Sequence, residues 1–187
     1  MFATQRQNEL FDALVDVLLS EGFAHLTLDD IAARLHCSKS TLYALADSKE
    51  QLVRAATIHF FRRATADVES RLDGVRGARD RITSYLAAVG KALAPVSRQF
   101  MNDLGAFAPA RQVYEDNTRI AADRVHDLIA DGVASGEFRQ VNAAFAADMI
   151  ATMMVRIQQG GLRATVGVDD AVAYSELASI LTSGMSA

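Results

Sequence analysis

Apolar residues recur at helical spacing along almost the whole of this chain. Leu10, Phe11, Leu14 and Leu18 fall on one side of a helix, which predicts a first helix over roughly residues 4–22. No stretch shows the alternation of apolar and polar residues, bounded by turn residues, that predicts a strand. The pattern therefore predicts an all-α fold. Further helices are expected from Thr27, from Ser38 through Tyr43, and over about 48–70, 78–93, 96–107, 110–135, 142–160 and 169–184.

Small and polar residues mark the ends of the first predicted helices. Gly22 suits the left-handed residue that often follows a helix. Thr27, followed three residues later by Asp30, resembles a capping box with Asp in place of the usual Glu. Ser38 and Ser48 can cap the third and fourth helices.

Residues 10–52 therefore read as a helix-turn-helix. A tight turn at His36-Cys37 leads into a short third helix that rests on the second. A short helix held in this way has the shape that enters a DNA major groove. The pattern favours a DNA-binding regulator over an enzyme.

Three further segments interrupt the helical pattern. The segment 73–77, with two glycines among charges, is expected to join the amino-terminal part to a larger body. Pro95 and Pro109 stand where new helices can begin, since proline is tolerated in a first turn. The segment 135–138 is expected to end one helix and to add an apolar anchor at Phe138.

Composition narrows the class of protein. A chain of 187 residues can bury a substantial core, and 2 prolines among them suit a helical protein. The chain has no apolar run of about 18 residues, as a membrane span needs, and its start lacks the pattern of a signal peptide. The single cysteine, Cys37, fits a reducing compartment. We therefore expect a cytoplasmic protein without a membrane partner.

Charge argues against nucleic acid at first sight. The chain has a formal net charge of -4, and its first fifty residues hold four basic side chains against eight acidic ones. A basic surface is the usual sign of DNA binding. Arg34, Lys39 and Lys49 nevertheless all fall in or beside the proposed turn and third helix. Few phosphate contacts per subunit are expected, so affinity should depend on dimerisation.

The sequence offers no catalytic or metal chemistry. His36 and Cys37 are adjacent, but a zinc site needs three or four ligands at matched spacing. The chain contains no glycine-rich phosphate loop, no nucleophile elbow and no paired Glu-x-x-His motif. We expect no enzyme activity, no metal and no cofactor, and Cys37 is expected to belong to the core.

The first fifty residues resemble the TetR family of transcriptional regulators. That family's pattern runs E-G-[FY], T-[LV]-x-x-I-A, S-x-[GS]-[TS]-L-Y and S-K-[ED]-x-L, and all four parts occur here in order. The matching positions are Glu21-Gly22-Phe23, Thr27-Leu28 with Ile31-Ala32, Ser38 through Tyr43, and Ser48-Lys49-Glu50 with Leu52. The resemblance implies an all-helical homodimer. Each subunit would have a DNA-binding domain at 1–50, whose connecting fourth helix covers about 48–70, and a ligand-binding and dimerisation domain at 51–187.

The resemblance also implies which residues contact DNA. Lys39 would pair with guanine or a phosphate, and nearby hydroxyls would make short hydrogen bonds to bases. Tyr43 would lay its ring on the sugar–phosphate backbone, and Lys49 would hold a phosphate at the start of the fourth helix. The complete set is Thr27, Ser38, Lys39, Ser40, Thr41, Tyr43 and Lys49.

Three positions depart from the family pattern. His36 stands where the turn usually has glycine, although histidine can adopt positive φ at some energetic cost. Leu45 and Ala46 replace the aromatic or histidine and the phenylalanine that often follow the tyrosine. These departures bear on the operator contacts more than on the fold.

The last two long helices are predicted to form a dimer interface. Between Val141 and Leu162 the only charges are Asp148 and Arg156, so this helix needs cover on more than one side. One face can pack in its own domain and the other against a second copy. The expected interface residues are Ile150, Met154, Ile157, Leu177, Ile180 and Leu181.

A group of aromatic and methionine residues could line an effector pocket. Such side chains form adaptable apolar pockets, although the same residues also suit an ordinary core. The expected ligand is a small apolar or amphipathic effector that repositions the fourth helix and releases DNA. The candidate lining residues are Tyr85, Phe100, Met101, Leu104, Phe107, Tyr114, Met149, Met153 and Arg156.

These observations predict a ligand-responsive repressor that binds a palindromic double-stranded DNA operator as a homodimer. The alternative is a helical adaptor that uses its first three helices to bind protein instead of DNA. The acidic charge of the first fifty residues is the best argument for the adaptor.

Overall fold

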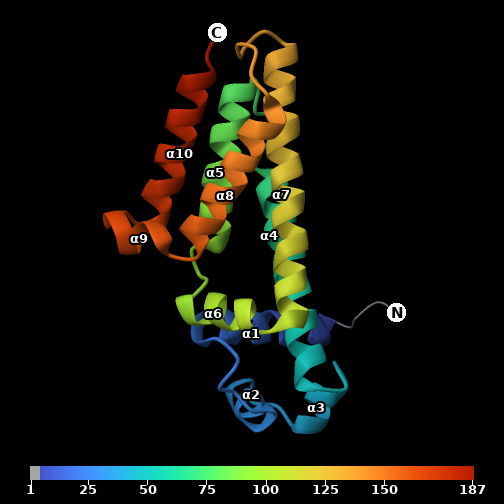
Figure 1. Ribbon diagram of the computed structural model, residues 1–187. Helices are drawn as coiled ribbons and strands as arrows, with labels where there is room; N and C mark the ends of the chain where they lie inside the picture. Colours follow the sequence, from blue (N-terminus) through green and yellow to red (C-terminus); the bar gives the residue numbers. More distant parts are fainter. Residues whose placement is uncertain (1–4) are drawn as a thin grey trace. The chain divides into compact units, whose positions relative to one another are not determined.

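The computed structural model describes residues 5–187, and these residues form an all-helical fold (Figure 1). The helices are α1 Gln5–Glu21, α2 Leu28–Arg34, α3 Lys39–Tyr43, α4 Lys49–Ser70, α5 Ala78–Leu93, α6 Arg98–Ala106, α7 Ala108–Ala134, α8 Ala143–Gln158, α9 Gly161–Val166 and α10 Asp170–Met185. The predicted helices are confirmed to within about two residues at each end. The predicted start of the first helix at residue 4 lies outside the described residues. The short helix α9 was not expected.

Two compact units make up the described chain. The first contains the residues up to 63 together with 95–115, and the second contains 64–94 together with 116–187. These units do not follow the expected division at residue 50, because α6 and the start of α7 pack in the first unit. The segment 73–77 was expected to join two domains, and this was wrong. It connects α4 to α5 inside the second unit, where Leu72 and Ala78 belong to one core.

The core of the first unit is built on Phe23, which follows α1. Its ring meets the edges of Phe100 in α6 and Phe107 just after α6, with both pairs of ring centroids 5.8 Å apart. Edge-to-face pairs of this kind stabilise by about 0.5–1.5 kcal/mol beyond the area that they bury. In the same unit Leu14 of α1 and Leu42 of α3 are almost fully buried. The helix-turn-helix therefore shares one core with α6.

The second unit is a helical bundle in which α10 packs against α5 and α8 (Figure 1). Gly132 in α7 leaves room for the ring of Phe138, which any larger side chain at this position would meet. Phe138 is buried beside Ala78, and its neighbour Glu137 reaches the start of α5. The predicted helix end and apolar anchor at 135–138 are confirmed.

The carboxylate of Glu137 caps α5, whose own first residues supply no side-chain cap. The backbone N–H of Ala78 donates to Oε2 over 2.6 Å and that of Arg79 donates to Oε1 over 2.9 Å. These two donated bonds lower the pKa of Glu137 below its usual value. They also satisfy two of the four N–H groups that every helix start leaves unpaired.

Candidate nucleic-acid interface

A carboxylate of α6 holds the turn between α1 and α2 by hydrogen bonds. Gly22 adopts φ +80°, and its N–H donates to the carbonyl of Leu18 over 2.9 Å, which ends α1 as predicted. The next two backbone N–H groups, of Phe23 and Ala24, donate to Oδ2 of Asp103 over 2.6 and 2.8 Å. Asp103 is only 5% exposed. No residue in the sequence pattern pointed to this role, because 79 or more positions separate the partners.

The capping box at the start of α2 is confirmed. The backbone N–H of Thr27 donates to Oδ2 of Asp30 over 2.8 Å, and the N–H of Asp30 donates to Oγ1 of Thr27 over 3.2 Å. The Thr27 hydroxyl also donates to the same carboxylate, which lowers the pKa of Asp30. Both polar groups of Thr27 are therefore engaged in the cap, and its expected role at DNA remains a prediction.

The turn before α3 contains a non-glycine residue with a left-handed backbone conformation. His36 has φ 48°, and among residues 5–187 it is the only non-glycine residue with positive φ. The N–H of Cys37 donates to the carbonyl of Ala32 over 3.0 Å and closes this turn. Cys37 is half-buried, and burial raises the pKa of its thiol. A thiol held protonated is a poor nucleophile.

Three hydroxyl groups meet at the start of α3. The Oγ of Ser38 accepts from the N–H of Thr41 over 3.2 Å, which confirms Ser38 as the cap. The same Oγ lies 2.7 Å from Oγ of Ser40 and 2.8 Å from Oγ1 of Thr41. Ser38 and Ser40 are exposed, and Thr41 is half-buried. Hydroxyls that bond one another can exchange those partners for base edges or phosphates.

Lys39 already has a partner within the chain. Its Nζ lies 2.7 Å from Oδ2 of Asp29 in α2, and this hydrogen bond raises the pKa of Lys39. Arg34 is likewise paired with Glu21, over 2.9 Å. Neither pair could be recognised from the sequence, in which both cations are expected to be available for phosphate. Neutralised cations release fewer counterions on binding DNA.

Tyr43 and Lys49 lie on either side of the loop between α3 and α4. Tyr43 is 51% exposed, which leaves its ring available to the sugar–phosphate backbone. Lys49 is the first residue of α4, and its Nζ donates to the carbonyl of Ala24 over 3.2 Å. Ser48 caps this helix by accepting from the N–H of Gln51 over 3.2 Å, as predicted. Unlike Lys39, Lys49 has no carboxylate partner among the described residues.

A family model supports this interpretation of the first unit. The model described as "Bacterial regulatory proteins, tetR family" matches residues 10–56, which span most of α1, all of α2 and α3, and the start of α4. Over this segment the chain is similar to the amino-terminal DNA-binding part of TetR-family regulators. The match supports a DNA-binding transcriptional regulator rather than an enzyme.

Solved structures of similar proteins share the fold over the whole chain. A putative transcriptional regulator from Saccharomonospora viridis, in complex with choline, superposes with a TM-score of 0.82 at 16% identity, covering 99% of this chain and 100% of that one. The fatty acid degradation regulator FadR from Bacillus halodurans gives 0.78 at 16% identity, covering 98% of each chain. A putative TetR-family regulator from Rhodococcus sp. gives 0.75 at 20% identity, covering 96% of this chain and 100% of that one. No curated protein matches the sequence.

The expected effector-pocket residues fall in both compact units. Tyr85, Met149, Met153 and Arg156 belong to the second unit, and the other five belong to the first. Tyr85 is buried, and burial raises its pKa to about 12. Met153 packs at the edge of the same core, whereas Met149 is 49% exposed. Phe100, Leu104 and Tyr114 are buried in the first unit, while Met101 and Phe107 are half-buried there.

Four of the six expected dimer-interface residues are enclosed within their own subunit. Ile150, Met154, Ile157 and Leu181 are buried in the core of the second unit, so the prediction that they face a second copy was wrong. Leu177 is partly buried against the same core, and Ile180 is 68% exposed. On α8 the exposed apolar residues are instead Phe145 and Met149. The reason is that both faces of this helix are apolar.

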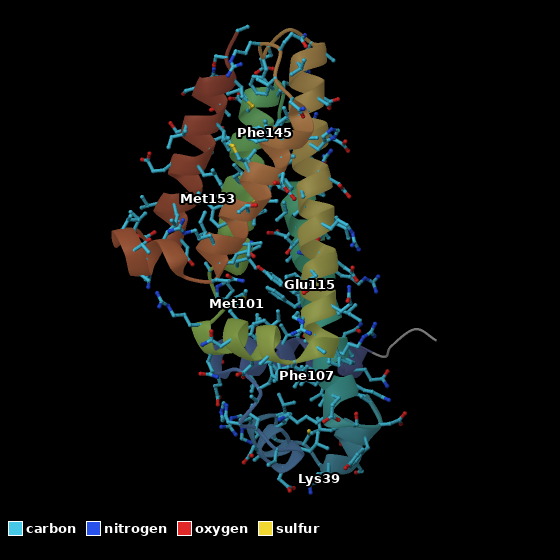
Figure 2. The ribbon with its side chains drawn as sticks, in the orientation of Figure 1. Lys39, Met101, Phe107, Glu115, Phe145 and Met153 are labelled. Carbon is cyan, nitrogen blue, oxygen red and sulfur yellow. The ribbon has the colours of Figure 1, made fainter. Side chains whose placement is uncertain are left out.

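The large apolar side chains that do reach the surface lie on α8 and α10. Phe145 is 66% exposed on α8, one helical turn before Met149 (Figure 2). Val172 and Ile180 are exposed on α10, two turns apart. Within residues 5–187, no group of His, Cys, Asp or Glu could hold a metal ion, and no helix is long and apolar enough to cross a membrane.

Proposed function

We propose that this TetR-family regulator is a homodimeric repressor of the cytoplasm that binds a palindromic operator and leaves it when a small effector binds. The observation that carries the proposal is the surface around α3. The hydroxyls at its start, the exposed ring of Tyr43 and the ammonium of Lys49 lie on consecutive elements. A short helix flanked by groups of this kind suits base contacts from its amino-terminal end and phosphate contacts on either side.

Lys49 is the principal phosphate contact in this proposal. It opens α4, where unpaired backbone N–H groups also favour an anion, and its own acceptor is a neutral carbonyl. Lys39 contributes less, because a phosphate must first displace Asp29. Ser40 and Thr41 would make the direct contacts to bases, while Ser38 and Thr27 would hold the two helix starts in place.

The dimer is proposed to form through α8 and α10. Exposed Phe145 and Met149 on one helix and Val172 and Ile180 on the other form two apolar rows. Such side chains are normally covered, and a two-fold axis would place both rows against their copies. Two DNA-binding domains related by that axis would read half-sites about one helical turn apart.

The effector is proposed to be small and apolar or amphipathic. The Saccharomonospora viridis relative holds choline, and the Bacillus halodurans relative regulates fatty acid degradation. Both descriptions fit regulators of this fold that respond to compact organic molecules. In this chain Tyr85, Met153 and Arg156 of the second unit remain the proposed contacts, and effector binding would reposition α4.

The first experiment is selection of a binding site from a randomised DNA duplex pool with the full chain at moderate salt. A repressor of this kind should enrich a palindrome, and K49A and Y43A should each weaken its binding about tenfold. K91A, which removes an exposed lysine from α5, is the matched control and should bind like the wild type. A folded dimer that enriches no sequence would favour the adaptor function, for which the acidic charge of the first fifty residues and the Lys39–Asp29 pair are the observations.

The dimer is tested separately by light scattering with size-exclusion chromatography. I180D and F145D should each give a monomer, because a buried unpaired charge opposes association. I120D changes an equally exposed isoleucine on α7 and should leave the mass unchanged. A monomeric wild type, or a dimer that survives both aspartates, would refute this interface.

A further inference from the structure

A cavity of about 270 Å³ opens within the first compact unit, between the α1–α2 turn, the start of α4 and the end of α6. Its apolar walls include Phe23, Val53 and Phe107. Three charged residues, Lys49, Glu50 and Asp103, also border it. All of these residues belong to one unit, and only Phe107 was among the expected effector contacts.

The two carboxylates at the cavity already accept hydrogen bonds from within the chain. Asp103 accepts the N–H groups of Phe23 and Ala24 at Oδ2, and the amide of Gln99 donates to Oδ1 over 2.7 Å. Glu50 turns back to accept hydrogen bonds from its own backbone and from Ser48, and these bonds lower its pKa.

Lys49 is the charged group that has N–H donors available for a ligand. An ammonium has three N–H donors, and among the described residues Nζ of Lys49 has one acceptor, the carbonyl of Ala24 at 3.2 Å. Two donors remain for a ligand at the rim of an otherwise apolar hollow. A hydrogen bond between an ammonium and a carboxylate is roughly twice as strong as one between neutral groups. Lys49 is therefore the group of this cavity that can donate to the carboxylate of a ligand.

We infer that this cavity binds a small organic monocarboxylate whose apolar body lies between Phe23, Val53 and Phe107 and whose carboxylate accepts from Lys49. The volume is just below the roughly 300–1,000 Å³ of sites for drug-sized ligands, so the ligand is compact, with about ten non-hydrogen atoms.

Occupation of this cavity would affect DNA binding through Lys49. A carboxylate on Nζ and an operator phosphate would compete for the same ammonium, so the ligand would weaken DNA binding from within the DNA-binding domain. This consequence rests on the proposed function, whereas the existence of the site does not. The site is also distinct from an effector pocket lined by Tyr85, Met153 and Arg156, which all lie in the other unit.

The site is tested first without DNA, by titrating the ¹⁵N-labelled full chain with phenylacetate and, in parallel, with the neutral phenylacetamide. Saturable shifts are expected at the amides of Phe23, Ala24, Val53 and Phe107 with the carboxylate only. K49M should weaken phenylacetate about tenfold, as loss of a charge-assisted hydrogen bond does. Equal binding of the amide, or no saturable shift at these positions, would overturn the proposal.

A second variant fills the hollow and leaves the charge in place. Ala106 is exposed at the end of α6 and borders the cavity, so A106L should abolish phenylacetate binding in a folded protein. Unchanged binding to A106L would refute the location of the site.

The final arm measures operator affinity with increasing phenylacetate. The apparent Kd should rise for the wild type and stay constant for A106L, which retains Lys49. If phenylacetate binds but no operator is found, the site stands and the proposed function fails. If an operator is bound but phenylacetate produces no saturable shifts, the function stands and the site fails.

Discussion

Asp103 offers the sharpest test of how α6 supports the helix-turn-helix. Its buried carboxylate accepts two backbone N–H groups, of Phe23 and Ala24, at 2.6 and 2.8 Å, and the side chain of Gln99 at 2.7 Å. No basic side chain of the described residues lies within ion-pair distance of it. The two backbone bonds therefore account for its charge being tolerated in the interior.

The magnitude follows from the donors that a substitution would leave unpaired. A hydrogen bond to a charged group contributes about 1.5–3 kcal/mol, and D103A removes two such bonds from backbone groups. Ala24 is exposed, so water can replace part of one bond. We therefore expect the lower end of the sum, about 3 kcal/mol. D103N keeps the volume and one accepting oxygen, and should lose about 1 kcal/mol.

Thermal and urea unfolding, followed by circular dichroism, measure the effect. For a chain of this length a loss of about 3 kcal/mol corresponds to a fall in Tm of roughly 6–12 °C. The matched control is D123A, because Asp123 is exposed on α7 with no partner among the described residues, and its removal should change Tm little. A D103A protein as stable as D123A would refute the reasoning, as would a D103N protein as damaged as D103A.

Three other predictions follow from individual contacts. H36G should be more stable than H36A by about 1 kcal/mol in urea unfolding, because both lose the imidazole but only alanine keeps a Cβ at φ 48°; equal stabilities would show that the turn is unstrained. E137Q should lower stability by about 1 kcal/mol at neutral pH, and the difference should shrink below about pH 4, since a carboxyl whose pKa is lowered on folding stabilises only while it is ionised; a difference independent of pH would contradict this account of the α5 cap. D29N should release Lys39 for a phosphate, so that DNA affinity rises and the salt dependence steepens by about 0.9 in slope. D47N removes the same charge without releasing a cation, and an equal effect from it would exclude a specific role for the pair.

Local patterns in the sequence predicted most of the helices and their ends. The capping box of Thr27 and Asp30, the cap at Ser38 and the left-handed Gly22 involve partners within four positions, and all are confirmed. The short helix α9 was not predicted, because six residues are too few to show a helical period.

Periodicity failed where a helix is apolar on both faces. On α8, Ile150 is buried and the adjacent Met149 is exposed, yet the sequence presents both as equivalent apolar positions. Only the packing of α10 against one side of α8 decides which face is left for a second copy. The expected interface therefore contained core residues and omitted Phe145.

The sequence by itself determined the all-helical class, the helix-turn-helix and its family, because these depend on spacings of a few residues and on caps formed within one turn. The tertiary structure alone decided which charges are available and which faces are free. Lys39 meets Asp29 across two helices, and Asp103 reaches a turn about eighty positions away, so neither pairing leaves a trace in local pattern. Such contacts are chosen by the packing of whole helices, which minimises exposed apolar area and unpaired polar groups over the entire unit.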